Sequence, residues 1–236
     1  MKKNESHRQV IVNKPWGYEY LIYENDEIAM WLLHIACGQK TSMHCHPTKT
    51  TGLVLLEGQA ELSFLADKKL ISAPEKQMLR RGLFHSTKAI SETGIFMLEV
   101  ETPNDKNDLV RLEDEYGRED LGYETREHEI LKSPECIWFS EPNLGTVDKY
   151  NLNGVVLTVE VSSEIDVINA KNDNDIVVFL RGGLGKTIDG RTHLATVAGD
   201  VGLAAVVKRV AKEMSFLEKN TLILTIPVVQ RNHPNS

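Results

Sequence analysis

The sequence has little cysteine. Only Cys37, Cys45 and Cys136 occur among 236 residues, and no two of them form a Cys-x-x-Cys pair. An odd and widely spaced set argues against a disulfide framework and is typical of proteins in a reducing compartment. We therefore expect a cytoplasmic protein.

Long apolar runs and basic clusters are also absent. No run approaches the ~18 apolar residues of a membrane span, and the opening segment, MKKNESHRQVIVNKPWG, lacks the apolar centre of a signal peptide. The net charge is -7 without a Lys/Arg-rich stripe, which argues against nucleic acid as a partner. Because the local field matters more than the total charge, an anionic small molecule remains compatible with this composition.

What the sequence does contain is a series of short apolar runs separated by Gly, Asn, Asp, Pro and Lys. This spacing is typical of an all-β sandwich or barrel. The runs that we interpret as strands are Met30–Ile35, Gly52–Leu56, Ala60–Leu65, Gly94–Val100, Val155–Val161, Asp175–Leu180, Leu203–Val207 and Thr221–Val229. Helical periodicity is weak, with short candidates at Tyr123–Leu131 and Val206–Glu213.

The chain divides into two β-rich parts. Residues 113–146 are charged and contain two prolines, so we interpret them as a connector between domains at 7–112 and 147–230. Both parts contain a strand–Gly–strand pattern, and Asp189-Gly190 predicts a hairpin in the second. The favoured architecture is therefore two barrels of which the second is degenerate; a single barrel with a β-rich appendage is the alternative.

The first part contains a candidate metal site. In the segment Met43-His44-Cys45-His46 the strand period places His44 and His46 on one face and Cys45 on the other. A glycine turn at Gly82 leads to His85, which supplies a third imidazole. Three neutral imidazoles leave coordination positions open, as catalytic metal sites require. We expect a divalent metal ion, zinc first, with manganese, nickel and iron as alternatives.

These residues resemble the two motifs of the cupin superfamily, whose fold is a double-stranded β-helix, or jelly roll. The positions that carry the resemblance are Gly38, His44, His46, Gly58, Gly82 and His85. Thr51 stands where the first motif has a metal-binding glutamate. The resemblance therefore implies an all-β cupin whose carboxylate ligand is missing, so that His44 replaces it, a three-histidine set is used, or metal binding is weakened.

A narrower resemblance surrounds this region. Lys14-Pro-Trp-Gly-Tyr-Glu19 and the segment Asn107–Arg118 are similar to the cupin domain of type II mannose-6-phosphate isomerases and of sugar-nucleotide pathway cupins. The resemblance implies a metal-dependent isomerase or epimerase acting on a phosphorylated or nucleotide-linked sugar in surface-polysaccharide metabolism, and a homodimer. Two alternatives stay open, a three-histidine iron dioxygenase and a non-catalytic sugar-phosphate-binding cupin.

Further candidates concern substrate and catalysis. Lys49, Arg80 and Arg111 are candidate anion-binding residues. The alternative for Lys49 is a solvated loop lysine, and for Arg80 it is a surface pair of arginines. For Arg111 the alternative is an ion pair with Glu113 or Asp114. Glu99 and Glu101 alternate on a strand and are candidates for a general base, although we favour a solvated face for them. The second part has no His-x-His, so we expect packing, dimerisation or substrate shaping there rather than metal binding.

Overall fold

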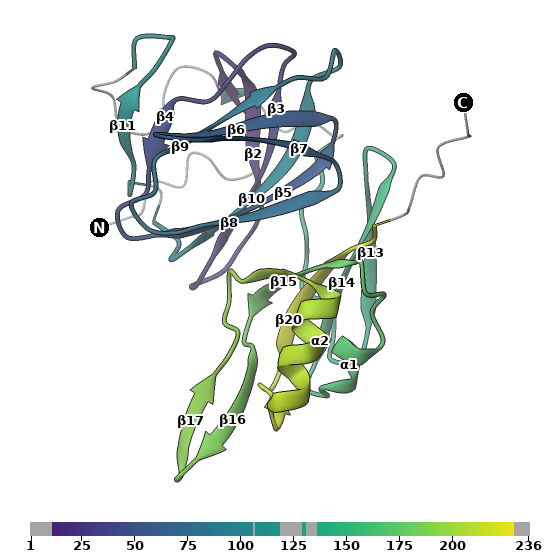
Figure 1. Cartoon of the computed structure of the whole chain (residues 1–236). Coiled ribbons are helices and arrows are strands. Elements are labelled where there is room, and N and C mark those ends of the chain that lie inside the picture. The colour runs from purple at the N-terminus through teal and green to yellow at the C-terminus, as the bar shows by residue number, and fades with distance from the viewer. Residues whose placement is uncertain (1–10, 106, 119–128, 131–135, 229–236) are drawn as a thin grey trace, which may run out of the picture. The chain divides into compact units, whose positions relative to one another are not determined.

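The protein is described by a computed structural model that covers residues 11–105, 107–118, 129–130 and 136–228. The chain divides into two compact units, Met1–Ser140 and Glu141–Ser236 (Figure 1). In the part of the chain that the structure describes, no helix is long and apolar enough to cross a membrane.

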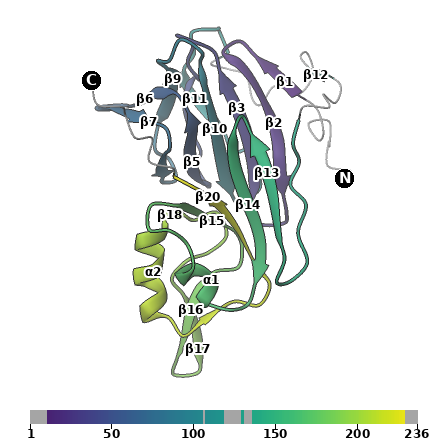
Figure 2. The same ribbon diagram turned by 90° about the vertical axis from the view of Figure 1, so that its right-hand side faces the viewer.

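The first unit consists of two antiparallel sheets. The seven-stranded sheet has the order β12 (Glu129–Ile130), β1 (Ile11–Lys14), β2 (Gly17–Glu24), β3 (Ala29–Ile35), β10 (Ile95–Thr102), β5 (Thr50–Glu57) and β8 (Glu75–Leu79). The five-stranded sheet has the order β11 (Val110–Glu113), β4 (Met43–Cys45), β9 (His85–Ala89), β6 (Gln59–Phe64) and β7 (Lys68–Ser72). Figure 2 shows the two sheets facing each other.

The core of this unit lies between the sheets. Alternate residues of β3, β5 and β10, such as Leu33, Leu55 and Met97, are buried in one cluster with Ala60 and Leu62 of β6. Period-2 alternation thus directs one face of each strand into the unit, as predicted for a jelly roll. The same alternation directs polar side chains of β4, β5, β9 and β10 inward at one end, and this is where the candidate site lies.

Most of the predicted connector 113–146 belongs to this first unit, which extends to Ser140. β11 ends at Glu113, β12 pairs with β1, and the Phe139 N–H donates to the Ile22 carbonyl. The helix predicted at Tyr123–Leu131 falls mainly outside the described residues. Of this segment the structure describes Glu129 and Ile130, which form strand β12, so the predicted helix was wrong at these two residues.

The second unit contains a five-stranded antiparallel sheet and a three-stranded one. The first has the order β13 (Val147–Leu152), β14 (Val155–Ser162), β20 (Thr221–Ile226), β15 (Ile176–Arg181) and β18 (Val201–Leu203). The second has the order β17 (Arg191–Leu194), β16 (Leu184–Ile188) and β19 (Phe216–Leu217). Its helices are α1 (Asp166–Asn169) and α2 (Ala204–Glu213). A second barrel stays a prediction for this unit.

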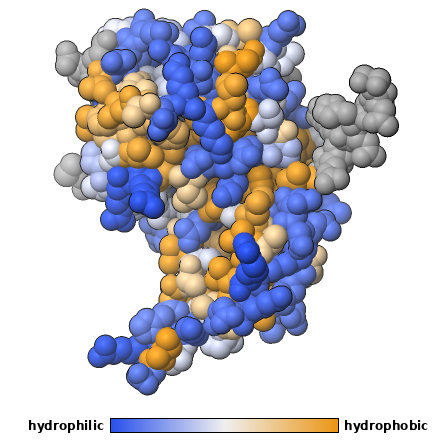
Figure 3. All heavy atoms as spheres, in the orientation of Figure 1, coloured by the Kyte–Doolittle hydropathy of each residue, from blue (hydrophilic) through white to orange (hydrophobic). Residues whose placement is uncertain are grey.

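Two sequence predictions in this unit have a clear outcome. The hairpin at Asp189-Gly190 is confirmed: both residues have positive φ, 50° and 73°, and connect β16 to β17. Figure 3 shows that this hairpin is largely hydrophilic with one apolar spot. The strand predicted at Leu203–Val207 was wrong beyond its first residue, because α2 starts at Ala204 and buries Val207 and Ala211 against Phe179 of the sheet.

Candidate metal centre

The three predicted histidines come together inside the first unit. His44 on β4 is paired directly with His85 on β9, and His46 follows β4 immediately. Their ring centroids are 4.4 Å apart for His44 and His85, 5.1 Å for His44 and His46, and 5.8 Å for His46 and His85. Cys45 does not line the cavity that His44 and His46 line, as strand alternation predicts.

Each histidine ring is oriented by a backbone carbonyl. The Nδ1 atoms of His44, His46 and His85 lie 2.8, 2.6 and 2.9 Å from the carbonyl oxygens of Ser42, Asp108 and Leu83. A carbonyl can only accept, so each Nδ1 carries the proton and each neutral ring keeps its lone pair on Nε2. In metal-binding histidines such a hydrogen bond from the other ring nitrogen fixes the tautomer and the orientation of the ring.

Burial keeps two of these rings, those of His44 and His85, neutral. Desolvation, and next to it the neighbouring His85 and His46, lower the pKa of His44 well below its usual value. Desolvation likewise lowers the pKa of His85 to about 4, with His46 contributing and the hydrogen bond to Leu83 opposing. Because a metal ion binds only deprotonated imidazole, the environment holds both rings in the binding form at neutral pH.

A carboxylate lies beside the three imidazoles, although the position of the motif glutamate is occupied by Thr51. Ligand atoms of His44, His46, His85 and Glu99 all lie within 4.8 Å of one another. Atoms bound to a single zinc ion at about 2.1 Å are at most about 4.2 Å apart, so the set needs only a small contraction to hold one ion. Glu99 is on β10, whereas the cupin motif has its glutamate at the position of Thr51 on β5.

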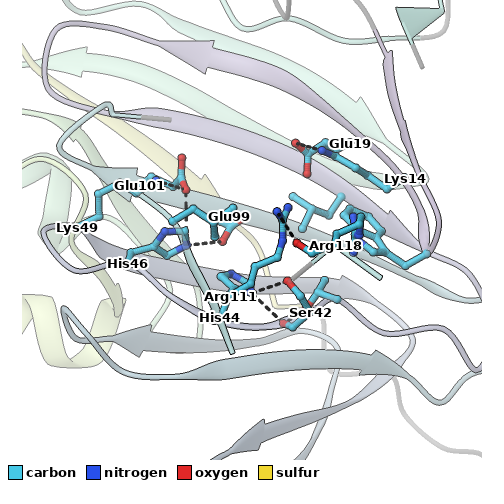
Figure 4. A pocket seen from close by; sticks show the side chains of 14 residues that line it. Lys14, Glu19, Ser42, His44, His46, Lys49, Glu99, Glu101, Arg111 and Arg118 are labelled. Atoms are coloured by element: carbon cyan, nitrogen blue, oxygen red, sulfur yellow. Dashed lines mark hydrogen bonds and ion pairs between the residues drawn. The ribbon is translucent and has the colours of Figure 1, made fainter. Parts of the chain in front are cut away.

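Glu99 and Glu101 do not form a solvated face, and the preference for that interpretation was wrong. Their exposed fractions are 9% and 2%. They continue the inward-facing row of Ile95 and Met97, which belong to the core, so the strand period carries both carboxylates into the unit. Their Oε1 atoms lie 4.0 and 3.8 Å from Nε2 of His46 (Figure 4).

Lys49 is buried as well, with 1% of its surface exposed, so it is not a solvated loop lysine. Its Nζ donates to Oε1 of Glu101 at 2.7 Å. Asp108 supports the backbone here, since its carboxylate accepts from the N–H groups of Thr48 and Lys49. The same residue therefore orients His46 through its carbonyl and fixes the chain that carries Lys49.

Arginine and lysine side chains occupy another part of the same cavity. Arg111 on β11 is paired with His44 on β4, and Arg111, Arg118 and Lys14 all line the cavity (Figure 4). Arg118 binds both oxygens of Asp114, at 2.6 and 3.0 Å. Lys14 lies 3.7 Å from Glu19. Arg80 is exposed and does not line this cavity.

The cavity itself is small, with a volume of about 60 Å³. One water needs about 10–15 Å³ on this measure, so a metal ion with several waters fits. Imidazoles and carboxylates line one part and guanidinium groups another, which suits a metal ion together with an anionic group.

The two facing sheets and the inward histidine cluster define the first unit as a cupin domain. Residues 1–114, slightly less than half of the chain, match the family described as "Mannose-6-phosphate isomerase C-terminal". No curated protein matches the chain significantly. The first half of the chain is thus similar to the cupin domain of mannose-6-phosphate isomerases, as its two flanking motifs predict.

Several solved structures are similar to part of the chain at low identity. One is an uncharacterized conserved protein with a double-stranded β-helix domain from Klebsiella pneumoniae, with 17% identity, coverage of 41% of this chain and 84% of that one, and a TM-score of 0.38. KdgF from Halomonas sp. has 13% identity, coverage of 44% and 94%, and a TM-score of 0.38. A putative sugar phosphate isomerase from Acidithiobacillus ferrooxidans has 18% identity, coverage of 34% and 52%, and a TM-score of 0.32.

Sequence reasoning missed several residues of the cavity. Arg118 and Lys14 lie within the two flanking motifs, so the resemblance could have suggested them. Asp108 contributes through its backbone carbonyl, for which a sequence gives no signal.

Proposed function

We propose that the first unit is a metal-dependent cupin that acts on a phosphorylated or nucleotide-linked sugar, as an isomerase or epimerase in carbohydrate metabolism. The observation that supports this most is the orientation of three imidazoles by three backbone carbonyls, with each Nε2 left as a ligand atom. The match of residues 1–114 to a mannose-6-phosphate isomerase domain supports the substrate class.

His44, His46 and His85 would hold the metal ion, for which zinc is the first expectation and manganese, nickel and iron are alternatives. When bound, a divalent ion would polarise a sugar carbonyl or its neighbouring hydroxyls as a Lewis acid. The donor set fits such an ion, because a hydrogen bond from Nδ1 orients each ring and desolvation keeps His44 and His85 neutral.

The other cavity residues supply the remaining functions. Arg111, supported by Arg118 and Lys14, would bind the phosphate, since a guanidinium offers paired donors for an oxyanion. Glu101 is our candidate for the base that takes a proton from the carbon next to the carbonyl and returns it to the neighbouring carbon. Lys49 would then act on Glu101 rather than on substrate, and Arg80, outside the cavity, has no part in this proposal.

The experiment combines metal analysis, ligand binding and proton exchange. Purified protein is analysed for metals and then screened for thermal stabilisation by mannose 6-phosphate, fructose 6-phosphate and nucleotide sugars. A stabilising sugar phosphate is incubated with the protein in D₂O, and NMR follows loss of the proton at C2 of an aldose phosphate or at C1 of a ketose phosphate. The proposal expects bound metal, stabilisation, and exchange that stops on chelation and returns when metal is restored.

Other outcomes would contradict the proposal in distinct ways. Iron together with oxygen consumption would indicate the dioxygenase, whereas stabilisation without exchange or turnover would indicate a binding protein. If neither sugar phosphates nor nucleotide sugars stabilise the protein, the substrate class is wrong.

A further inference from the structure

The cavity contains two buried carboxylates on one strand, and their surroundings differ. Glu99 belongs to the group whose ligand atoms lie within 4.8 Å of one another, and Glu101 does not. Glu101 instead accepts a hydrogen bond from the buried ammonium of Lys49 at 2.7 Å. Both residues lie on the inner face of β10, so their surroundings, not their side-chain chemistry, distinguish them.

We infer that Glu99 is the fourth protein ligand of the metal, supplied by β10, and that Lys49 holds Glu101 outside the coordination sphere. The inference rests on the metal site of the proposed function but not on the identity of the substrate. It assigns a different role to each of the two carboxylates that sequence reasoning left equivalent.

Charge supports this assignment. An ionised carboxylate in a protein interior requires a cation close by. Lys49 provides one for Glu101, and a divalent ion held by three imidazoles would provide one for Glu99.

The strand register explains why the carboxylate can come from β10. Thr51 is directly opposite Glu101 in the pairing of β5 with β10, so both side chains lie on the inner face. Glu99 is two residues from Glu101 along β10 and is therefore diagonal to Thr51, and diagonal positions, about 7–8 Å apart, are within reach of long side chains. A carboxylate on β5 or on β10 can therefore reach the same position between the two sheets. The Thr51 hydroxyl makes no hydrogen bond within the described part of the chain.

The test compares Glu99→Gln with its matched control, Glu101→Gln, which makes the same chemical change two residues further along the strand. Metal-free protein is titrated with Co²⁺ and Zn²⁺, and affinity is measured by competition with a chelator of known strength. The visible absorption of the Co²⁺ protein reports the ligand set independently of any enzymatic activity. Circular dichroism shows whether each variant is folded.

Changes in the outer surroundings of a metal ion typically cost about 10–100-fold in affinity, so we expect Glu101→Gln to fall in or below that range and to leave the Co²⁺ spectrum unaltered. Glu99→Gln, which removes a ligand atom, is expected to lower the affinity by more than about 100-fold and to change the spectrum. Equal effects of the two variants, or a larger effect of Glu101→Gln, would overturn the inference while leaving a metal-dependent enzyme possible. Wild-type protein that binds no metal would overturn both.

A second variant tests the register directly. Thr51→Glu combined with Glu99→Gln returns the carboxylate to β5 and keeps two carboxylates in the cavity. Recovery of at least tenfold in affinity over Glu99→Gln alone is expected. If this double variant does not fold, the contrast between the two single variants still decides the matter.

Discussion

Replacing Lys49 by Met should destabilise the first unit far more than replacing an exposed lysine that makes an equally short ion pair. Lys49 lies 2.7 Å from Glu101, and the exposed fractions of their side chains are 1% and 3%. The matched pair is Lys68 with Glu61 at 2.8 Å, with exposed fractions of 67% and 23%. The two pairs have nearly the same geometry, so the comparison isolates the effect of burial.

The magnitude follows from what remains after the substitution. Removing Lys49 leaves the Glu101 carboxylate buried without its ammonium partner, and breaking a buried pair costs about 3–5 kcal/mol. Removing Lys68 leaves Glu61 in contact with water, and exposed pairs contribute only about 0–1 kcal/mol. The double variant Lys49→Met/Glu101→Gln removes both charges, so it should recover a large part of the loss.

The assay is urea denaturation of metal-free protein followed by tryptophan fluorescence. All three tryptophans of the sequence, Trp16, Trp31 and Trp138, belong to the unit Met1–Ser140, so the signal reports that unit. A loss below about 1 kcal/mol for Lys49→Met, or a double variant no more stable than the single one, would refute the reasoning.

Three further results are expected. Arg111→Gln should abolish stabilisation by a sugar phosphate in thermal denaturation, whereas Arg80→Gln, outside the cavity, should leave it intact; equal effects would contradict the placement of the anion. Chelation of the metal should lower stability by about 2.7 kcal/mol if free metal had been at 100 times its dissociation constant, and re-addition should reverse this. In metal-free protein the pKa of His85 is about 4, below the ordinary 6.5, so the unfolded chain takes up the proton first on acidification. The contribution of His85 to the free energy of unfolding is therefore complete above pH 6.5 and is lost as the pH falls towards 4, by at most about 3 kcal/mol. Urea titrations of wild type and His85→Gln at several pH values would measure this loss. Identical pH profiles of the two proteins would contradict the prediction.

The parts of this site that the sequence predicts are those encoded by local periodicity. The alternation of Met43-His44-Cys45-His46 is enough to place both imidazoles on one face, and the turn at Gly82 places His85 at the start of the next strand. Alternation also predicts that Glu99 and Glu101 share one face of their strand. It does not predict whether that face is the inner or the outer one. That depends on the register of β10 against β3 and β5, which is set by residues more than 40 positions away.

Contacts between residues that are far apart in the sequence could not be predicted, for the same reason. Lys49 and Glu101 are 52 residues apart, and His46 and the Asp108 carbonyl are 62 apart. A lysine three residues after a His-x-His pair is typical of a solvated loop, and only the packed unit shows that its ammonium group is enclosed. The resemblance to a family motif directed attention to Thr51 on β5, whereas the carboxylates lie on the neighbouring strand.

Repulsion across the strand pair gives a reason for threonine at position 51. Glu99 and Glu101 already place two buried carboxylates on the inner face of β10. A glutamate at position 51 would add a third carboxylate directly opposite Glu101 across the strand pair, where like charges repel. Thr51→Glu alone should therefore lower the stability of the metal-free first unit, and adding Glu101→Gln should restore most of it. Urea denaturation measures both variants; equal stability of Thr51→Glu and wild type would mean that the barrel accommodates a third carboxylate, and that residue 51 is not constrained by Glu101.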